Sequence, residues 1–143
     1  EMSRGLGDVY KRQACGRFEE RGGGHLVVIT SVGGLRGGGA APAYNASKAY
    51  QINYAEGLRQ RAAKSGLPLL VTDIRPGFVA TALLRNADYP MLMRPEKVAE
   101  TLFRALECGK RRIVIDHRYA LLVRLWRLIP QGVWERLPIR SRD

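Results

Sequence analysis

The feature of this sequence that most constrains its fold is an alternation of short apolar runs with longer segments of helical periodicity. Three runs have the length and composition of buried strands. They are residues 25–30 (HLVVIT), 67–77 (LPLLVTDIRPG, ending in Pro-Gly) and 111–116 (RRIVID). Strands that alternate with helices imply right-handed βαβ units and a parallel sheet. The sequence therefore predicts an α/β fold.

Two helices are predicted between these strands. Residues 43–64 carry apolar side chains at approximately helical spacing, and Gly66 follows the end of the run. Pro95 fits a helix start, the helix is expected to reach about residue 107, and Gly109 closes it. A long loop is expected between the first strand and the first of these helices.

Polar side chains follow two of the predicted strands at the point where each ends. Ser31 lies after the first strand, and Pro76-Gly77 lies after the second, so both are expected at the carboxyl edge of the sheet. Tyr44 and Lys48 are four residues apart at a helix start and project from the same face. A phenol beside an ammonium suits proton exchange, because a nearby positive charge lowers the pKa of a tyrosine. Ser31 is expected to hold a substrate oxygen by a hydrogen bond.

The order of these motifs resembles that of the short-chain dehydrogenase/reductase family. The resemblance covers about residues 17–116 and corresponds to the C-terminal half of that fold. It implies half of a Rossmann-type doubly wound parallel sheet, with three strands alternating with helices. The motifs that carry it are the apolar strand, Ser31, Gly33-Gly34, YNASK at 44–48 and PGFVAT at 76–81.

The resemblance implies an NAD(P)-dependent oxidoreductase that interconverts a carbonyl and an alcohol by hydride transfer. Tyr44 would be the catalytic acid/base. Lys48 would lower the pKa of Tyr44 and bind the nicotinamide ribose, and Ser31 would orient the substrate oxygen. The cofactor would be NAD or NADP, and no metal site is expected. The residues expected to bind the cofactor are Tyr44, Lys48, Pro76, Gly77, Val79 and Thr81.

One family feature is missing from the sequence, because no G-x-G-x-x-G turn occurs in it. That turn, and the asparagine that commonly completes the catalytic set, would lie upstream of Ala14. The chain is therefore interpreted as an N-terminally truncated fragment, which alone is expected neither to bind NAD(P) appreciably nor to catalyse hydride transfer.

Three segments are predicted along the chain. Residues 1–13 are interpreted as a non-native, assembly-derived tail, because DVYKRQ resembles a translated transposon end used in sequencing libraries. Residues 14–117 are predicted to be a partial Rossmann-fold oxidoreductase domain. Residues 118–143 are predicted to be a C-terminal amphipathic helical extension.

The extension has two interpretations, which stay open at this point. It contains many apolar residues with Arg118, Arg124 and Arg127 between them. Such a helix can lie in a membrane interface, with Trp126 and Trp134 at headgroup depth. It can equally pack on its own domain or on a partner subunit.

The net charge of +11 raises the question of a polyanionic partner. The arginines are scattered among acids such as Asp73 and Glu100, and are interpreted as solvating helix faces, so a nucleic-acid partner is not expected. A basic nucleic-acid or membrane-surface protein remains one alternative function. A non-catalytic dinucleotide-binding module of the same fold is another, against which the intact Ser-Tyr-Lys set argues.

The expected partner is a small carbonyl or alcohol substrate. Apolar residues in a predicted lid, 82–93, suggest an apolar substrate. Its apolar residues are Leu83, Leu84, Met91, Leu92 and Met93. Two cysteines without a C-x-x-C pair favour a reduced, cytoplasmic protein with possible membrane association through 118–143. The full-length protein is expected to be a homo-oligomer.

Overall fold

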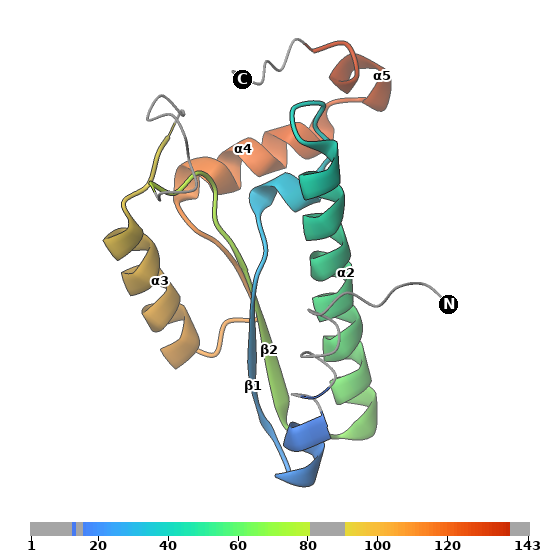
Figure 1. Ribbon diagram of the computed structural model, residues 1–143, viewed down its shortest axis with the longest axis vertical. Coiled ribbons are helices and arrows are strands. Elements are labelled where there is room, and N and C mark those ends of the chain that lie inside the picture. The colour runs from blue at the N-terminus through green and yellow to red at the C-terminus, as the bar shows by residue number, and fades with distance from the viewer. Residues whose placement is uncertain (1–12, 14–15, 81–90, 138–143) are drawn as a thin grey trace.

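The computed structural model describes residues 13, 16–80 and 91–137, and within them the chain forms one parallel sheet beside helices (Figure 1). The strands are β1 (Gly24–Ile29), β2 (Leu69–Arg75) and β3 (Arg112–Val114), in the spatial order β1-β2-β3. Both pairings are parallel, with Gly24 opposite Leu69 and Asp73 opposite Arg112. The predicted α/β class with three strands is therefore confirmed.

The two predicted helices lie where the sequence placed them, to within about one residue. The helices are α2 (Pro42–Ser65), α3 (Pro95–Glu107), α4 (His117–Leu128) and α5 (Gln131–Trp134), with a 3-10 helix η1 (Val32–Leu35). Proline occupies the first turn of α2 and of α3, and Gly66 ends α2 with a φ of 69°. The predicted long loop after β1 contains η1. Nowhere in the described ranges is a helix both long enough and apolar enough to span a membrane.

The helices α2 and α3 cover opposite faces of the sheet (Figure 1). Val28 and Val71 pack with Ala55 of α2, whereas Leu102 of α3 packs on the cluster that contains Ile74. Because the strand order advances in one direction, the crossovers through α2 and α3 have opposite hands. The expectation of right-handed units throughout is therefore wrong for one unit. The long connection of residues 76–94 gives the chain enough length to reach the other face.

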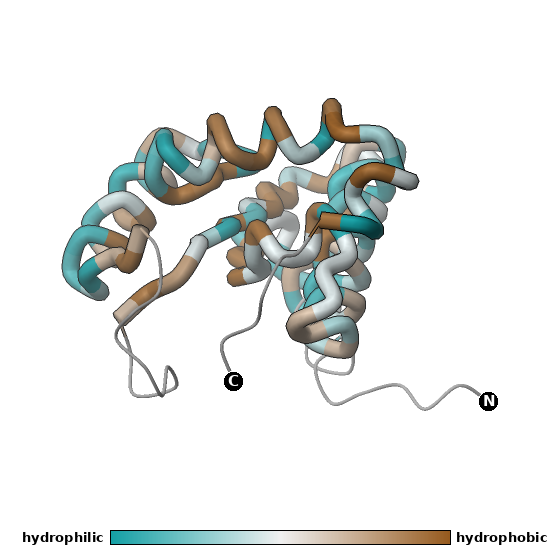
Figure 2. Tube along the Cα trace, turned by 90° about the horizontal axis from the view of Figure 1, so that it is seen from above, coloured by the Kyte–Doolittle hydropathy of each residue, from teal (hydrophilic) through white to brown (hydrophobic). Residues whose placement is uncertain are grey.

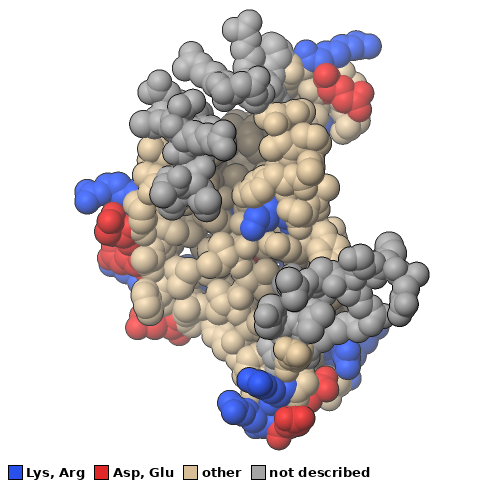
Figure 3. Space-filling view, viewed as in Figure 1, with Lys and Arg blue, Asp and Glu red and all other residues tan. Residues whose placement is uncertain are grey.

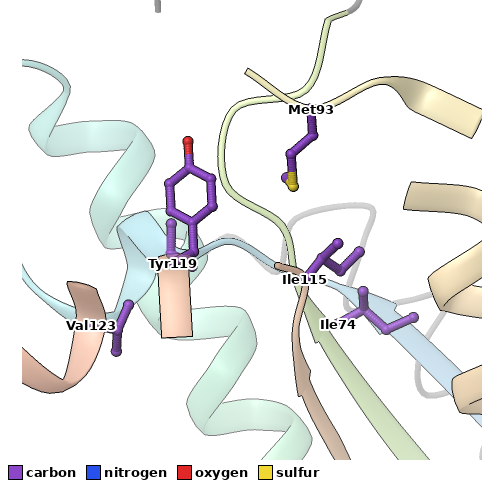
Figure 4. Packing of buried hydrophobic residues seen from close by; sticks show 6 residues of the cluster. Ile74, Met93, Ile115, Tyr119 and Val123 are labelled. Atoms are coloured by element: carbon purple, nitrogen blue, oxygen red, sulfur yellow. The ribbon is translucent and has the colours of Figure 1, made fainter. Parts of the chain in front are cut away.

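The main hydrophobic core lies between the sheet, α3 and α4. Tyr119 and Val123 of α4 are 2% and 8% exposed and pack with Ile74, Met93 and Ile115 (Figure 4). The predicted lid residue Met93 is thus part of the core, whereas Leu83 and Leu84 lie outside the described residues.

The predicted single helical extension is two helices, because the chain leaves helical geometry at Ile129 and Pro130 precedes α5. Proline lacks the backbone N–H that would continue a helix. The buried side of α4 shows that the extension packs on its own domain, which was one of the two interpretations.

A buried ion pair lies on the sheet face that α2 covers. Asp73 is fully buried and Arg75 is 6% exposed. The guanidinium of Arg75 donates to Asp73 Oδ2 over 2.8 Å from Nε, and its Nη2 lies 2.6 Å from the same oxygen. The Thr30 hydroxyl donates to Asp73 Oδ1 over 2.6 Å. These two charges are therefore structural and do not solvate a helix face.

The surface charges are mixed in sign on the face drawn in Figure 3. Lysine and arginine side chains lie beside aspartate and glutamate at the edges of this face, and its middle is largely uncharged. This distribution agrees with the scattered arrangement of charges along the sequence.

Gly34 lets η1 contact the backbone of α2. A Cβ at this position would lie 2.6 Å from the carbonyl carbon of Lys48 and 2.8 Å from the amide nitrogen of Ala49. We expect Gly34→Ala to destabilise the fold by about 1–3 kcal/mol, because these backbone atoms must move. Gly37→Ala is the control, since nothing lies within 4 Å of its added Cβ. Equal urea unfolding midpoints for both variants would contradict this close contact.

Candidate active site

Ser31 joins the ends of β1 and β2. It is the N-cap of η1 and is 7% exposed. Its Oγ accepts a hydrogen bond from the amide of Gly33 over 3.1 Å and donates to the carbonyl of Pro76 over 3.5 Å. The amide of Val32 donates to the same carbonyl over 3.1 Å. The two strand ends that carry the predicted motifs are therefore in direct contact.

Tyr44 and Lys48 lie in the first two turns of α2, one turn apart. The Lys48 ammonium is 5.8 Å from the centroid of the Tyr44 ring, and Tyr44 is half exposed. Lys48 Nζ donates to the Ile29 carbonyl and to Gln51 Oε1, each over 3.3 Å. Burial lowers the pKa of Lys48 from its usual value. The ammonium thus fastens the start of α2 to the carboxyl end of β1.

Gly33 is close to both the serine hydroxyl and the tyrosine ring. A Cβ added to Gly33 would be 3.5 Å from Ser31 Oγ, 3.6 Å from Tyr44 Cε1 and 2.9 Å from Asn45 Oδ1. The side chains of Ser31 and Tyr44 therefore both lie next to this glycine. With Lys48 beside the tyrosine ring, all three polar groups lie at the carboxyl edge of the sheet.

The segment after β2 continues along the same edge. Val79 forms a parallel bridge with Met93, and the Ala80 amide donates to the Met93 carbonyl over 2.9 Å. Met93 in turn donates its amide to the Phe78 carbonyl over 2.9 Å. Pro76, Gly77 and Val79 thus follow the strand end at Ser31. Thr81 lies outside the described residues.

Tyr119 supports this segment from α4, a role that the sequence did not reveal. A Cβ on Gly77 would lie 2.2 Å from the Tyr119 ring, so the ring packs directly on the glycine backbone. The Phe78 amide donates to the Tyr119 hydroxyl over 3.1 Å, and that hydroxyl donates to the Met91 carbonyl over 3.3 Å. Burial raises the pKa of Tyr119, so the phenol stays protonated. The one sequence signal was a tyrosine among the apolar residues of the predicted extension.

Arg36 anchors the glycine-rich loop before α2 on the C-terminal helices. Its guanidinium donates to the Trp126 carbonyl, and to the Ile129 carbonyl over 2.8 Å, and lies 4.4 Å from the centroid of the Trp134 ring. Trp134 Nε1 donates to the Gly37 carbonyl over 2.6 Å. Trp134 is only 8% exposed, so this side chain does not occupy the headgroup position that the membrane interpretation of the extension gave it. Its indole packs inward because its N–H has a backbone acceptor there.

We expect Tyr119→Phe to weaken binding of the dinucleotide that the sequence predicts for this edge of the sheet, while kcat stays near that of the parent. The variant removes the hydroxyl that accepts from the Phe78 amide, a loss of about 1–3 kcal/mol that loosens the segment after β2. The KM for the dinucleotide should rise several-fold in the whole protein that carries this chain. A lower unfolding midpoint with an unchanged KM would show that Tyr119 supports the fold and not the site.

Comparison with known proteins gives two results from sequence. A sequence profile described as short chain dehydrogenase matches residues 9–90. An uncharacterized oxidoreductase of Mycobacterium tuberculosis is 36% identical over 118 residues, which cover 82% of this chain and 47% of the relative. The chain thus spans about half the length of the curated relatives it matches. The profile match begins inside residues 1–13, whose interpretation as a non-native tail stays a prediction.

Solved structures with a similar fold include two complexes. A short chain dehydrogenase from Burkholderia cenocepacia in complex with NADP superposes with a TM-score of 0.77 at 20% identity, covering 96% of this chain and 56% of the other. A short-chain dehydrogenase from Sphingobium yanoikuyae in complex with NADPH gives 0.66 at 19% identity, with the same coverages. At these sequence identities the structural similarity shows a shared fold alone.

Proposed function

The chain belongs to the short-chain dehydrogenase family, and from this membership we propose that the protein carrying it interconverts a carbonyl and an alcohol with NAD(P). The observation that carries the proposal is that Ser31, Tyr44 and Lys48 lie near one another at the carboxyl edge of the sheet, beside Pro76-Gly77. In parallel sheets ligands bind at this edge. The chain covers about half of its relatives, so the activity is proposed for the whole protein.

The residues present fit the nicotinamide end of a dinucleotide. An ammonium has three N–H donors, and acceptors in the described part of the chain take two of those of Lys48. The third suits a ribose hydroxyl. When bound, the nicotinamide supplies or accepts the hydride. The proposed cofactor, NAD or NADP, is supported by the NADP and NADPH complexes of proteins with this fold. Its proposed contacts are Tyr44, Lys48, Pro76, Gly77, Val79 and Thr81.

Two hydroxyl groups act on the substrate oxygen in this proposal. Tyr44 donates its proton to the oxygen as an alkoxide develops there, and takes a proton from the alcohol in the reverse direction. Its half-exposed side chain leaves access for a substrate. Ser31 donates a hydrogen bond that strengthens as the charge grows. Its present bond to the Pro76 carbonyl, at 3.5 Å, is long and therefore costs little to exchange for a substrate oxygen.

The substrate class and the setting of the protein remain predictions. The proposed apolar carbonyl substrate rests on Leu92 among the described lid residues, because Met93 belongs to the core and Met91 packs against it. A homo-oligomeric state, a cytoplasmic location and the truncation of the chain are likewise proposed.

The proposal is tested with the whole protein that carries this chain, NADH or NADPH, and a panel of ketones and aldehydes. We expect Lys48→Ala to lower both dinucleotide affinity and turnover, because the ammonium faces the phenol and the proposed ribose site. Lys64→Ala, in the last turn of α2, is the matched control and should behave as the parent. Tight dinucleotide binding without oxidation of the cofactor by any carbonyl would favour the non-catalytic binding module.

A further inference from the structure

The outward side of α4 is an apolar stripe. Leu121, Leu125 and Leu128 are 59%, 51% and 78% exposed. Their spacing of four and three residues places them along one side of the helix, opposite the buried Tyr119 and Val123. Figure 2 shows hydrophobic residues along the side of α4 that faces away from the rest of the molecule. The helix therefore uses one side for the core and presents the other to its surroundings.

The polar residues beside this stripe are cationic. Arg124 and Arg127 are exposed, and α4 contains no acidic residue. Arg118 is already paired, since its Nη2 lies 2.7 Å from Asp116 Oδ2. That hydrogen bond lowers the pKa of Asp116 to about 2, so the pair stays ionised at neutral pH. Arg124 and Arg127, which form no ion pair with another described residue, thus lie beside the three leucines.

We propose that the outward side of α4 docks on the surface of a bilayer that contains anionic lipid. A helix with leucines on one side and arginines at their border has the pattern of an interfacial helix, in which apolar side chains enter the acyl boundary and cations meet lipid phosphates. The net charge of the whole chain, +11, has the same sign as this border.

The charges disfavour a second copy of the chain as the occupant. In a symmetric contact the same surface patch of both copies meets, which would place Arg124 and Arg127 of two helices in one interface, where α4 supplies no acidic residue to pair with them. Like charges at such a contact repel each other, whereas an anionic lipid surface attracts them. Arg36 and Tyr119 fasten α4 to the rest of the domain, so the stripe is held in place before it meets a membrane.

The test uses the whole protein that carries this chain and two kinds of vesicle, phosphatidylcholine alone and phosphatidylcholine with phosphatidylglycerol. We expect co-sedimentation with the second kind only. Arg124→Gln with Arg127→Gln should weaken this binding about 30-fold, since each arginine near an anionic surface strengthens binding by a factor of about five. Leu125→Gln with Leu128→Gln should weaken it at least about tenfold through lost apolar burial. Phe103→Gln, at an exposed residue of α3, is the control and should bind as the parent.

Circular dichroism and unfolding midpoints establish that the variants fold, which is expected because the substituted side chains are exposed. Equal sedimentation of the leucine variant and the parent would overturn the proposal. So would equal binding to both kinds of vesicle, or a dimer of the parent that the leucine substitutions dissociate. These outcomes leave the proposed catalysis untouched, because none of the substituted residues lies in the site.

Discussion

Tyr44→Phe is expected to lower turnover by a factor of about 10² to 10⁴, the usual contribution of a positioned acid or base. The substitution removes the hydroxyl that would protonate the alkoxide and keeps the ring beside Lys48. Dinucleotide affinity should stay nearly unchanged, because the lost group moves a proton and the ammonium of Lys48 remains in place. Steady-state kinetics and fluorescence titration with the dinucleotide measure the two quantities separately.

The control for this variant is Tyr50→Phe, a second half-exposed tyrosine of α2 whose ring stacks on Tyr54. It should turn over substrate at the rate of the parent. Turnover of Tyr44→Phe within a few-fold of the parent would remove Tyr44 from the proposed role.

Arg75→Ala is expected to cost about 3–5 kcal/mol of folding free energy, because it leaves a buried carboxylate without its cation. Asp73 is fully buried, and the Thr30 hydroxyl alone does not neutralise its charge. Arg104→Ala is the matched control, since its ion pair with Glu100 is exposed on α3. Exposed pairs contribute at most about 1 kcal/mol.

Urea unfolding of both variants and of the parent measures the difference. A loss for Arg75→Ala no larger than that for Arg104→Ala would contradict the structural role of the buried pair. A double variant with apolar residues at 73 and 75 should recover much of the loss, because no unpaired charge then remains.

The helices and strands that could be predicted from the sequence are those whose ends carry proline or glycine. Pro42 and Pro95 mark helix starts, and Gly66 and Gly109 follow helix ends with positive φ angles. Such residues act through local backbone geometry, which a sequence shows directly. The placement of Ser31 at the edge also follows from sequence, because the ends of parallel strands lie together.

The features that the sequence did not reveal depend on contacts between distant residues. Tyr119 meets Phe78 across 41 positions, and Arg36 meets Trp126 across 90. In the sequence Asp73 is one of many scattered charged residues. Only the structure shows that it is buried in the sheet and paired with Arg75. The hand of the crossover through α3 depends likewise on which face of the sheet that helix packs against.

Transfer of a labelled hydride tests the central claim most directly. NADH or NADPH carrying deuterium at the transferable position of the nicotinamide would be incubated with the whole protein that carries this chain and with a ketone that it reduces. Mass spectrometry of the alcohol should then find deuterium on the carbinol carbon, and Tyr44→Phe and Ser31→Ala should form far less of that product. An alcohol without deuterium, or equal labelling by the Tyr44→Phe variant, would contradict hydride transfer at the site of Ser31, Tyr44 and Lys48.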